Sequence, residues 1–395
     1  MIDSVCSILI TPKDLIDSTG LNYRILLDYS HPKKRGRSMT YGNYPDLSKV
    51  KKILVIKLRH HGDVLLTSPL FSHLRKALPD VQLDAYVYKD TYPMLEGHPD
   101  VNTFFHYDKA WKKLSFFKKI VKEVQILRKI RRQKYDMIIN LTEGDRGALI
   151  AKICRPKYSV GMQREGKKNA YSHTIKSSST PRHTVEKQLD ALRCIGLFPS
   201  EEDRELFFHI SDEDRQRALM LIEGIKDYVV VHPVSRWRFK CPPPHIVANV
   251  VKDLILRGKK VVFTSGPDKQ EMDIVASIVA LLPKEGIIDL SGKTSLKELG
   301  AVIKGSQMLF CVDSVPLHMA SALKTPVVVL FGPTSEVNWG PWMHAHSRVV
   351  TKTVPCRPCF KDGCAGSKMS DCLYTISPKV IINSIDSLLE EVYGK

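Results

Sequence analysis

The feature that most constrains the fold is a regular alternation of short apolar runs with longer stretches of helical character. From Lys51 onward, strand-length runs occupy residues 53–56, 83–88 and 136–141. A second series follows, at residues 228–233, 260–265, 286–292, 308–313 and 326–332. Parallel strands need a crossover connection, which is usually a helix, so this alternation predicts two doubly wound α/β domains with parallel sheets.

The chain of 395 residues is long enough for two such domains. We place the boundary near residue 225, after a helix-start signal at Ser211-Asp212-Glu213-Asp214, so the domains are expected at 49–225 and 226–395. Residues 1–48 lack periodicity. We interpret them as a poorly ordered extension, or as the product of an upstream start codon with Met39 as the true beginning.

Ligands of doubly wound sheets bind beyond the carboxyl ends of the strands. Two sheets facing each other therefore predict a site in a cleft between the domains. The first apolar run leads into RHHGDVLL, in which Gly62 would make a tight turn and Asp63 would open a helix. From the residues alone, Asp63 either caps that helix or is a catalytic carboxylate, with His60 and His61 beside it as polar partners for an acceptor hydroxyl.

In the second domain, Asp313 and Ser314 follow an apolar run, and Pro316 stands in the first turn of a helix of small residues. Ser314 either caps this helix or leaves backbone N–H groups available for a phosphate. The segment HPVSRWRFK, residues 232–240, also leaves a strand and brings Ser235 and Lys240 to the same edge. A cation there would neutralise a leaving diphosphate.

The chain lacks both G-x-G-x-x-G and G-x-x-x-x-G-K-[ST], so a nicotinamide dehydrogenase or a P-loop enzyme has no sequence support. Four cysteines cluster near the end of the chain, at 356, 359, 364 and 372. This spacing indicates either a structural zinc site or reduced thiols in a loop, and we favour the thiols. The other five cysteines are scattered, which is typical of a reducing compartment.

The formal net charge of +18 favours anionic partners. Between Lys109 and Lys134 there are eleven Lys or Arg residues and one acid, Glu123, while an apolar stripe recurs at helical spacing. The stripe consists of Leu114, Phe117, Val121, Val124 and Leu127. This basic amphipathic helix either packs on the core with a solvated face or holds the protein on an anionic membrane.

Four segments together resemble the lipopolysaccharide core heptosyltransferases of glycosyltransferase family 9, and the heptosyltransferase III branch most of all. They are IKLRHHGDVLLTSP, HPVSRWRFK, FTSGPDKQE and VDSVPLHMASAL with the following FGPT. The resemblance extends from about Lys51 to Leu389. It implies a GT-B fold of two Rossmann-like domains facing across a cleft, and inverting transfer of heptose from ADP-heptose to the inner core of lipopolysaccharide without a metal or other cofactor.

The resemblance also implies roles for individual residues. Asp63 would be the general base, and we assign His60, His61 and Arg146 to acceptor binding. The donor would be held by residues of the second domain. They are Ser235, Lys240, Asp313, Ser314 and His318, with Asp268 or Glu271 at the ribose.

Two other functions remain open at this point. One is a transferase for a different nucleotide sugar, and the other is a basic binding protein for nucleic acid or an anionic surface. Against nucleic acid, no recognised motif is present and the aromatic residues are not interleaved with the basic runs. Asp3 at the N-terminus is atypical of a signal peptide, so we expect a cytoplasmic protein, peripheral on the inner face of the inner membrane.

Overall fold

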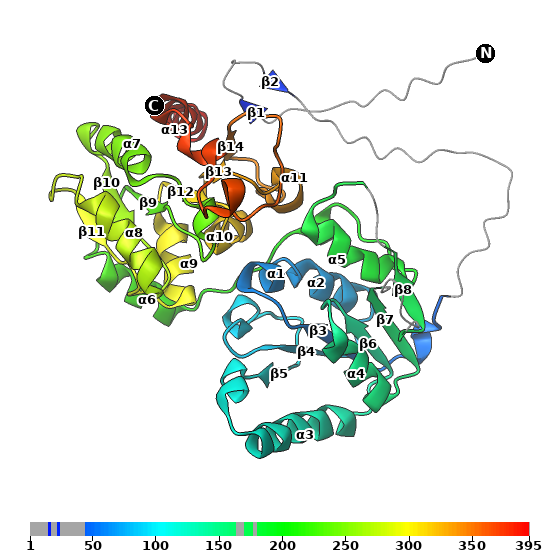
Figure 1. The fold of residues 1–395 in the computed structure, drawn as a ribbon. Helices are drawn as coiled ribbons and strands as arrows, with labels where there is room; N and C mark the ends of the chain where they lie inside the picture. The colour runs from blue at the N-terminus through cyan, green and yellow to red at the C-terminus, as the bar shows by residue number, and fades with distance from the viewer. Residues whose placement is uncertain (1–14, 17–21, 24–43, 163–169, 177–179, 395) are drawn as a thin grey trace, which may run out of the picture. The chain divides into compact units, whose positions relative to one another are not determined.

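A computed structural model of the chain describes residues 15–16, 22–23, 44–162, 170–176 and 180–394 (Figure 1). The contacts divide the chain into two compact units: one consists of residues 40–209, and the other of residues 210–395 together with the strand pair at residues 15–16 and 22–23. We call them the N-terminal unit and the C-terminal unit. Each contains one sheet.

The N-terminal unit has a six-stranded parallel sheet in the order β5-β4-β3-β6-β7-β8. Its strands are β3 (Lys52–Lys57), β4 (Gln82–Tyr88), β5 (Thr103–Tyr107), β6 (Met137–Asn140), β7 (Tyr158–Met162) and β8 (His173–Ile175). Its α-helices are α1 (His61–Leu65), α2 (Ser68–Ala77), α3 (Phe116–Arg132), α4 (Asp145–Cys154) and α5 (Thr184–Arg193). Short 3-10 helices are η1 (Leu47–Lys49), η2 (Tyr92–Met94), η3 (Lys109–Lys113) and η4 (Glu202–Arg204).

Helices cover both faces of this sheet, with α3 and α4 on one face and α1, α2 and α5 on the other (Figure 1). On the face under α3 and α4, Leu54 and Ile56 of β3 pack in one hydrophobic core with Ile130 of α3 and Ile150 of α4. Strand β3 is central and is buried almost throughout, because helices cover it from both sides. Its carboxyl end is therefore fixed within the unit.

The C-terminal unit contains an eight-stranded sheet in the order β11-β10-β9-β12-β13-β14-β1-β2. The first six strands in this order, from β11 through β9 to β14, are parallel. Strand β1 pairs in parallel with β14, and β2 pairs antiparallel with β1. The strands are β1 (Leu15–Ile16), β2 (Asn22–Tyr23), β9 (Tyr228–His232), β10 (Lys260–Phe263), β11 (Ile287–Asp289), β12 (Met308–Val312), β13 (Val327–Phe331) and β14 (Ser347–Thr351).

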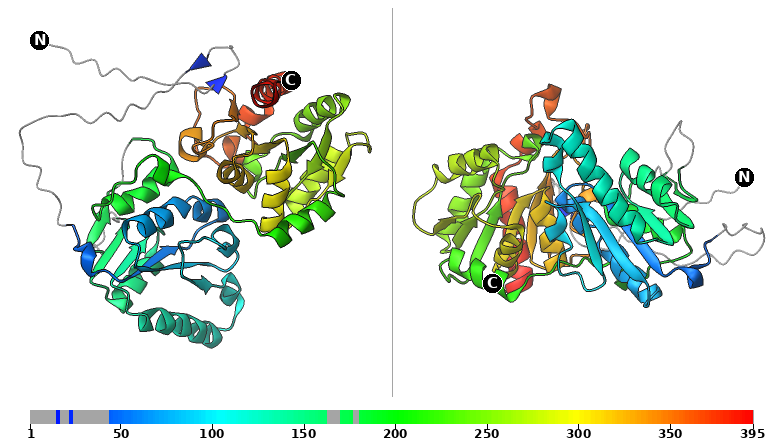
Figure 2. Two further views of the ribbon diagram at one scale, coloured as in Figure 1. Left: turned by 180° about the vertical axis from the view of Figure 1, so that it is seen from behind. Right: turned by 90° about the horizontal axis from the view of Figure 1, so that it is seen from below.

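Helices also cover both faces of this second sheet, as the two views of Figure 2 show. Residues of α7, α8 and α13 form one core with the sheet, and α6, α9 and α10 pack together separately from them. The α-helices are α6 (Asp212–Leu221), α7 (Pro244–Leu256), α8 (Lys269–Val279), α9 (Leu296–Gly305), α10 (Val315–Leu323), α11 (Glu336–Trp339), α12 (Asp371–Tyr374) and α13 (Pro378–Tyr393). The 3-10 helices are η5 (Arg238–Lys240) and η6 (Cys364–Gly366).

The contacts divide the chain about fifteen residues earlier than the boundary we expected near residue 225. The reason is helix α6, which packs on α9 of the C-terminal unit, where Arg217 pairs with Glu298 at 3.0 Å. The helix start itself is as predicted: Ser211 and Asp214 form a reciprocal capping box. The expectation of a poorly ordered extension at 1–48 falls mostly outside the described residues.

Candidate active site

Asp63 lies just beyond the carboxyl end of β3, in the first turn of α1. The helix begins at His61, so the expected tight turn at Gly62 is instead helical. The N-cap position belongs to His60, and no side chain makes a capping hydrogen bond. Asp63 is therefore not the N-cap residue, but its carboxylate stands in the first turn, at the third helical residue, where the helix dipole favours its negative charge.

Two cations flank the Asp63 carboxylate, whose side chain is 12% exposed. Lys57 Nζ and Arg59 Nε each lie 4.0 Å from Asp63 Oδ1. Lys57 is buried and donates a hydrogen bond to the Leu141 carbonyl at 3.2 Å, and its burial lowers the pKa of the ammonium to about 8. The carboxylate of Asp63 beyond the end of β3 therefore has two positively charged side chains, Lys57 and Arg59, beside it.

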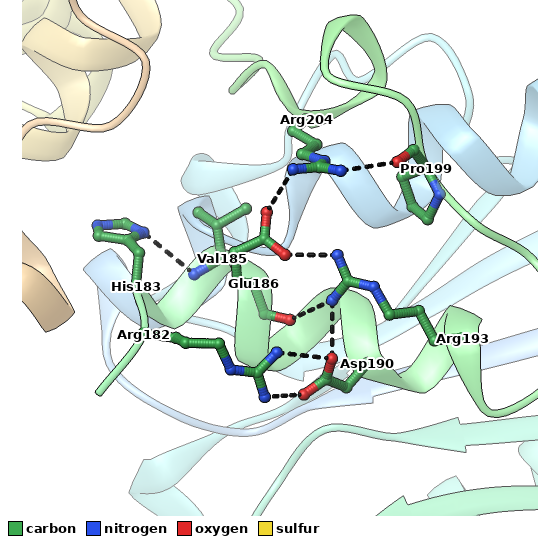
Figure 3. A network of polar contacts seen from close by, with 8 residues as sticks. All are labelled: Arg182, His183, Val185, Glu186, Asp190, Arg193, Pro199 and Arg204. Atoms are coloured by element: carbon green, nitrogen blue, oxygen red, sulfur yellow. Dashed lines mark hydrogen bonds and ion pairs between the residues drawn. The ribbon is translucent and has the colours of Figure 1, made fainter. Parts of the chain in front are cut away.

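Helix α5 supports the segment that carries Asp63. The amide of Gln188 donates to the Asp63 carbonyl at 3.3 Å, and α5 packs against α2. This helix is held in turn by a network of charged side chains (Figure 3). Glu186 pairs with Arg193 and Arg204, and Asp190 pairs with Arg182 and Arg193. Sequence reasoning missed this network, since its members are ordinary surface residue types whose pairing depends on the tertiary fold.

The other residues assigned to the acceptor have defined partners. His61 lies 3.0 Å from the Asp90 carbonyl, which can only accept, so Nε2 carries the hydrogen. Arg146 forms a bidentate pair with Glu123 of α3 at 2.6 and 3.0 Å, and its guanidinium lies 4.1 Å from the centre of the Tyr107 ring. These contacts tie Arg146 to α3 and β5, and its role in acceptor binding stays a prediction.

Two of the expected donor residues, Lys240 and Asp313, meet at the carboxyl ends of the strands of the C-terminal sheet, and Thr334 joins them. Lys240, in η5, places Nζ 2.7 Å from Asp313 Oδ2, and the Thr334 hydroxyl donates to the same oxygen at 2.6 Å. Asp313 follows β12 directly, and Thr334 follows β13. The structure therefore joins the SRWRFK, VDSVP and GPT segments through one buried carboxylate.

Ser314 occupies the N-cap position of α10, but its side chain makes no capping hydrogen bond and donates instead to the Val312 carbonyl at 3.1 Å. The cap interpretation is therefore wrong for its hydroxyl. His318 is buried one turn further along this helix. Ser235, also buried, accepts a hydrogen bond from the Trp237 backbone N–H at 3.3 Å.

The two candidates for the ribose have local structural roles. Asp268 is the N-cap of α8 and accepts from the Gln270 N–H at 3.0 Å. Glu271 accepts from the Gly266 N–H at 3.0 Å, and burial raises its pKa. Both groups lie next to the end of β10, where a ligand of a doubly wound sheet is expected.

The described part of the chain also has a cavity of about 560 Å³ in the C-terminal unit. Asp227, Lys259 and Gln307 line it, and each of these residues directly precedes a strand. This cavity therefore lies at the amino ends of the strands, away from the edge that holds Lys240 and Asp313.

Comparison with known proteins decides the family. The model of glycosyltransferase family 9 (heptosyltransferase) matches residues 124–370. Two proteins named lipopolysaccharide heptosyltransferase 3, both from Escherichia coli, are 32% and 34% identical to this chain over 72% of its length, and the matches cover 84% and 83% of theirs. The chain belongs to glycosyltransferase family 9.

Solved structures of similar fold agree with this assignment. A family 9 glycosyl transferase from Veillonella parvula matches with a TM-score of 0.74, at 24% identity, over 86% of this chain and 98% of its own. The E. coli heptosyltransferase WaaC with ADP matches with a TM-score of 0.66, at 17% identity, over 85% and 99% of the two chains. The predicted GT-B fold with two Rossmann-like domains is confirmed, and so is the prediction of a heptosyltransferase.

The cysteine-rich loop of this family 9 transferase contacts both donor-side segments. Arg357 donates to the Gly332 carbonyl at 2.6 Å and pairs with Glu336 at 2.8 Å, while the Ser370 hydroxyl donates to the Phe239 carbonyl at 2.7 Å. A side chain at position 332 would displace the buried Leu373, so glycine at this turn lets the loop lie close to it. The loop thus supports the edge that holds Lys240 and Asp313, a role that cysteine spacing did not reveal.

The four clustered thiols are close enough to influence one another. Burial raises the pKa of the Cys372 thiol to about 11, with smaller contributions from Cys364, Cys359 and Cys356, and Cys364 accepts the Asp371 N–H at 3.5 Å. Within the described ranges, no group of three or more His, Cys, Asp or Glu side chains is arranged to hold a metal ion. The zinc interpretation therefore gains no support.

The buried ammonium of Lys57 predicts a pH dependence of stability. Its pKa is about 8 in the folded protein and near 10.4 in an unfolded chain, so the unfolded state binds more protons between these values and stability rises with pH across this window. From pH 7.5 to 9.5 the gain is about 2 kcal/mol at 1.36 kcal/mol per pKa unit. Urea unfolding should show this gain in the wild type relative to Lys57→Met. If the free energy of unfolding depends on pH equally in the two proteins, the pKa of Lys57 is not lowered by burial.

Proposed function

We propose that this transferase moves heptose from ADP-heptose to the inner core of lipopolysaccharide, with inversion at the anomeric carbon. The acceptor hydroxyl oxygen would attack that carbon while its bond to the diphosphate oxygen breaks. Asp63 would take the hydroxyl proton, and ADP would leave. The observation that carries the proposal is the carboxylate of Asp63 beyond the end of β3, with Lys57 and Arg59 each 4.0 Å from its Oδ1.

The donor would bind at the edge shared by Lys240, Asp313 and the start of α10. Lys240 uses one ammonium N–H on Asp313, and an ammonium has three. The first N–H groups of α10 have no side-chain cap, which suits a phosphate at that helix start. Together they would stabilise the negative charge that grows on the leaving diphosphate without a cofactor. Asp268 or Glu271 would meet the ribose, with Ser235 and His318 nearby.

The acceptor would bind on the N-terminal unit, at Asp63 with His60, His61 and Arg146. We propose that this acceptor is lipid-anchored and that the enzyme acts as a peripheral protein on the cytoplasmic face of the inner membrane. Among the described residues, no helix is both long and apolar enough to cross a membrane. Membrane contact would then occur through a surface.

The direct test is a transfer assay with purified enzyme, ADP-heptose and a heptosylated core saccharide. We expect ADP release coupled to an acceptor heavier by one heptose, at least ten-fold faster than with UDP- or GDP-sugars. Faster transfer from another nucleotide sugar would replace this proposal with the transferase alternative. Tight oligonucleotide binding without any transfer would favour the basic binding protein instead.

A further inference from the structure

The N-terminal half of α3 exposes an apolar ridge that nothing in the described structure covers. Phe116 is 71% exposed, Phe117 80% and Val121 52%, and Ile120 and Leu114 are also exposed. Ile120 and Val121 follow Phe117 by three and four residues, so both share one side of the helix with it. The expectation that this stripe packs on the core is wrong for this half of the helix.

The C-terminal half of the same helix behaves differently. Ile130 is fully buried, and Ile126 and Leu127 pack against the core of the N-terminal unit. Glu123 is held by Arg146 and by the Tyr107 hydroxyl. The unit thus fixes α3 along one side and from its middle onward, while the first turns present large apolar side chains to the outside.

A set of lysines borders the exposed ridge. Lys112 and Lys113 precede it in η3, and Lys118 and Lys122 lie beside it in α3, all four exposed. No ion pair involves any of these four within the ranges that the structure describes. Their charge is uncompensated locally, unlike that of Lys109, which pairs with Asp90 at 2.7 Å.

We propose that this ridge and its lysines form a membrane-docking surface for anionic phospholipid. We call the set Leu114, Phe116, Phe117, Ile120, Val121, Lys112, Lys113, Lys118 and Lys122 the docking face. Lysines attract the anionic headgroups, and an apolar ridge with two phenylalanines inserts at the boundary between headgroups and acyl chains, as interfacial amphipathic helices do. A polyanion such as nucleic acid would use the lysines but would leave Phe117, Ile120 and Val121 without a matching surface.

This proposal deepens the proposed function. It rests on that function only for the reason why the protein would bind a membrane, which is that a lipid-anchored acceptor lies in the membrane surface. The docking face is also in the unit that carries Asp63. Membrane contact through this face would therefore affect binding of the acceptor. It would not affect binding of the donor to the C-terminal unit.

The test uses the full chain and two variants of the docking face. One replaces Phe116, Phe117 and Val121 by Gln, which removes the ridge but keeps the charge. The other replaces Lys112, Lys113, Lys118 and Lys122 by Gln, which does the reverse. Lys119 and Lys129 are left intact, because Lys119 is half-buried beside Glu123 and Lys129 lies 5.5 Å from the Phe105 ring centre.

Matched controls come from the C-terminal unit. Met220→Gln with Leu256→Gln removes two apolar side chains that are 71% and 87% exposed. Gln at Lys226, Lys252, Lys260 and Lys284 removes four exposed charges. The measurement is sedimentation with vesicles of phosphatidylglycerol and phosphatidylcholine at about 0.15 M salt, where screening is already substantial, with pure phosphatidylcholine vesicles for comparison.

We expect the wild type to bind the anionic vesicles, each docking-face variant to bind at least ten-fold more weakly, and both controls to bind like the wild type. A Phe117→Trp variant should also gain indole fluorescence that brominated lipid quenches. Vesicle binding by the ridge variant equal to wild type would overturn the proposal, and so would indole fluorescence in Phe117→Trp that brominated lipid leaves unchanged. A wild-type dimer that the ridge variant converts to monomer, without vesicle binding, would also overturn it, since the ridge would then join two copies.

Activity separates this proposal from the proposed function. With a soluble core saccharide stripped of its lipid, the docking-face variants should keep at least half of the wild-type kcat/KM. With acceptor in anionic vesicles, their KM should rise at least ten-fold. If the wild type transfers no heptose to either acceptor but still binds vesicles through this face, the proposed function fails and the docking surface stands.

Discussion

Asp63→Asn is expected to lower kcat by about 10² to 10⁴ while leaving the affinity for ADP-heptose nearly unchanged. Asparagine keeps the size of the side chain and its place in the first turn of α1, but it cannot accept the hydroxyl proton. The residues proposed to bind the donor lie in the C-terminal unit, so ADP binding should not respond. Steady-state kinetics and ADP titration measure the two effects separately.

Two controls make the Asp63 result specific. Asp212→Asn alters another first-turn aspartate, which is exposed in α6, and should leave kcat unchanged. Circular dichroism must show that Asp63→Asn folds, because the change leaves Lys57 and Arg59 facing a neutral amide. If a folded Asp63→Asn enzyme keeps more than about a third of wild-type turnover, Asp63 is not the base.

Lys240→Ala should reduce kcat/KM by about 10² to 10³, through both weaker donor binding and slower departure of ADP. Loss of one preorganised donor to a developing negative charge typically costs this much. The change also leaves the buried Asp313 with Thr334 alone on its Oδ2, so some loss of stability is expected. Lys240→Arg keeps the charge and should recover part of the donor affinity.

Asp313→Asn separates a direct role of Lys240 from an indirect one. If Lys240 contacts the diphosphate, the double variant Lys240→Ala with Asp313→Asn should be no more active than Lys240→Ala alone. It should also not regain affinity for the donor. Restored ADP affinity in the double variant would show that Lys240 only neutralises Asp313.

Activity should also survive EDTA, because the proposed mechanism uses no metal. Loss of activity on chelation, with recovery in Mg²⁺ or Mn²⁺, would contradict the metal-free mechanism.

Most strands that sequence reasoning found are buried on both faces, although β11, a partly buried edge strand, was also found. β3, β9 and β13 are continuous apolar runs, and a run of four to six such residues between helical stretches is a strong local signal. The strands β5, β7, β8 and β14 were not predicted, because segments such as His173–Ile175 or Ser347–Thr351 mix polar and apolar residues. They lie towards the sheet edges, where burial is partial.

The sequence by itself determined the alternation of elements, the capping box at Ser211 and the segment that puts Asp63 after β3. These depend on neighbours within a few residues, through hydrogen bonds and helical or strand periodicity. The tertiary structure alone decided the partners of distant side chains. Lys240 meets Asp313, 73 residues away, and Arg146 is held by Glu123.

The docking face shows the same division most clearly. Helical spacing predicted one apolar stripe along α3, but spacing cannot tell which part of a helix the sheet is long enough to cover. Packing against β5 and α4 begins only from the middle of α3, so Ile130 is buried while Phe117 is exposed. Burial is a property of the surfaces that meet, and the sequence of one helix does not contain them.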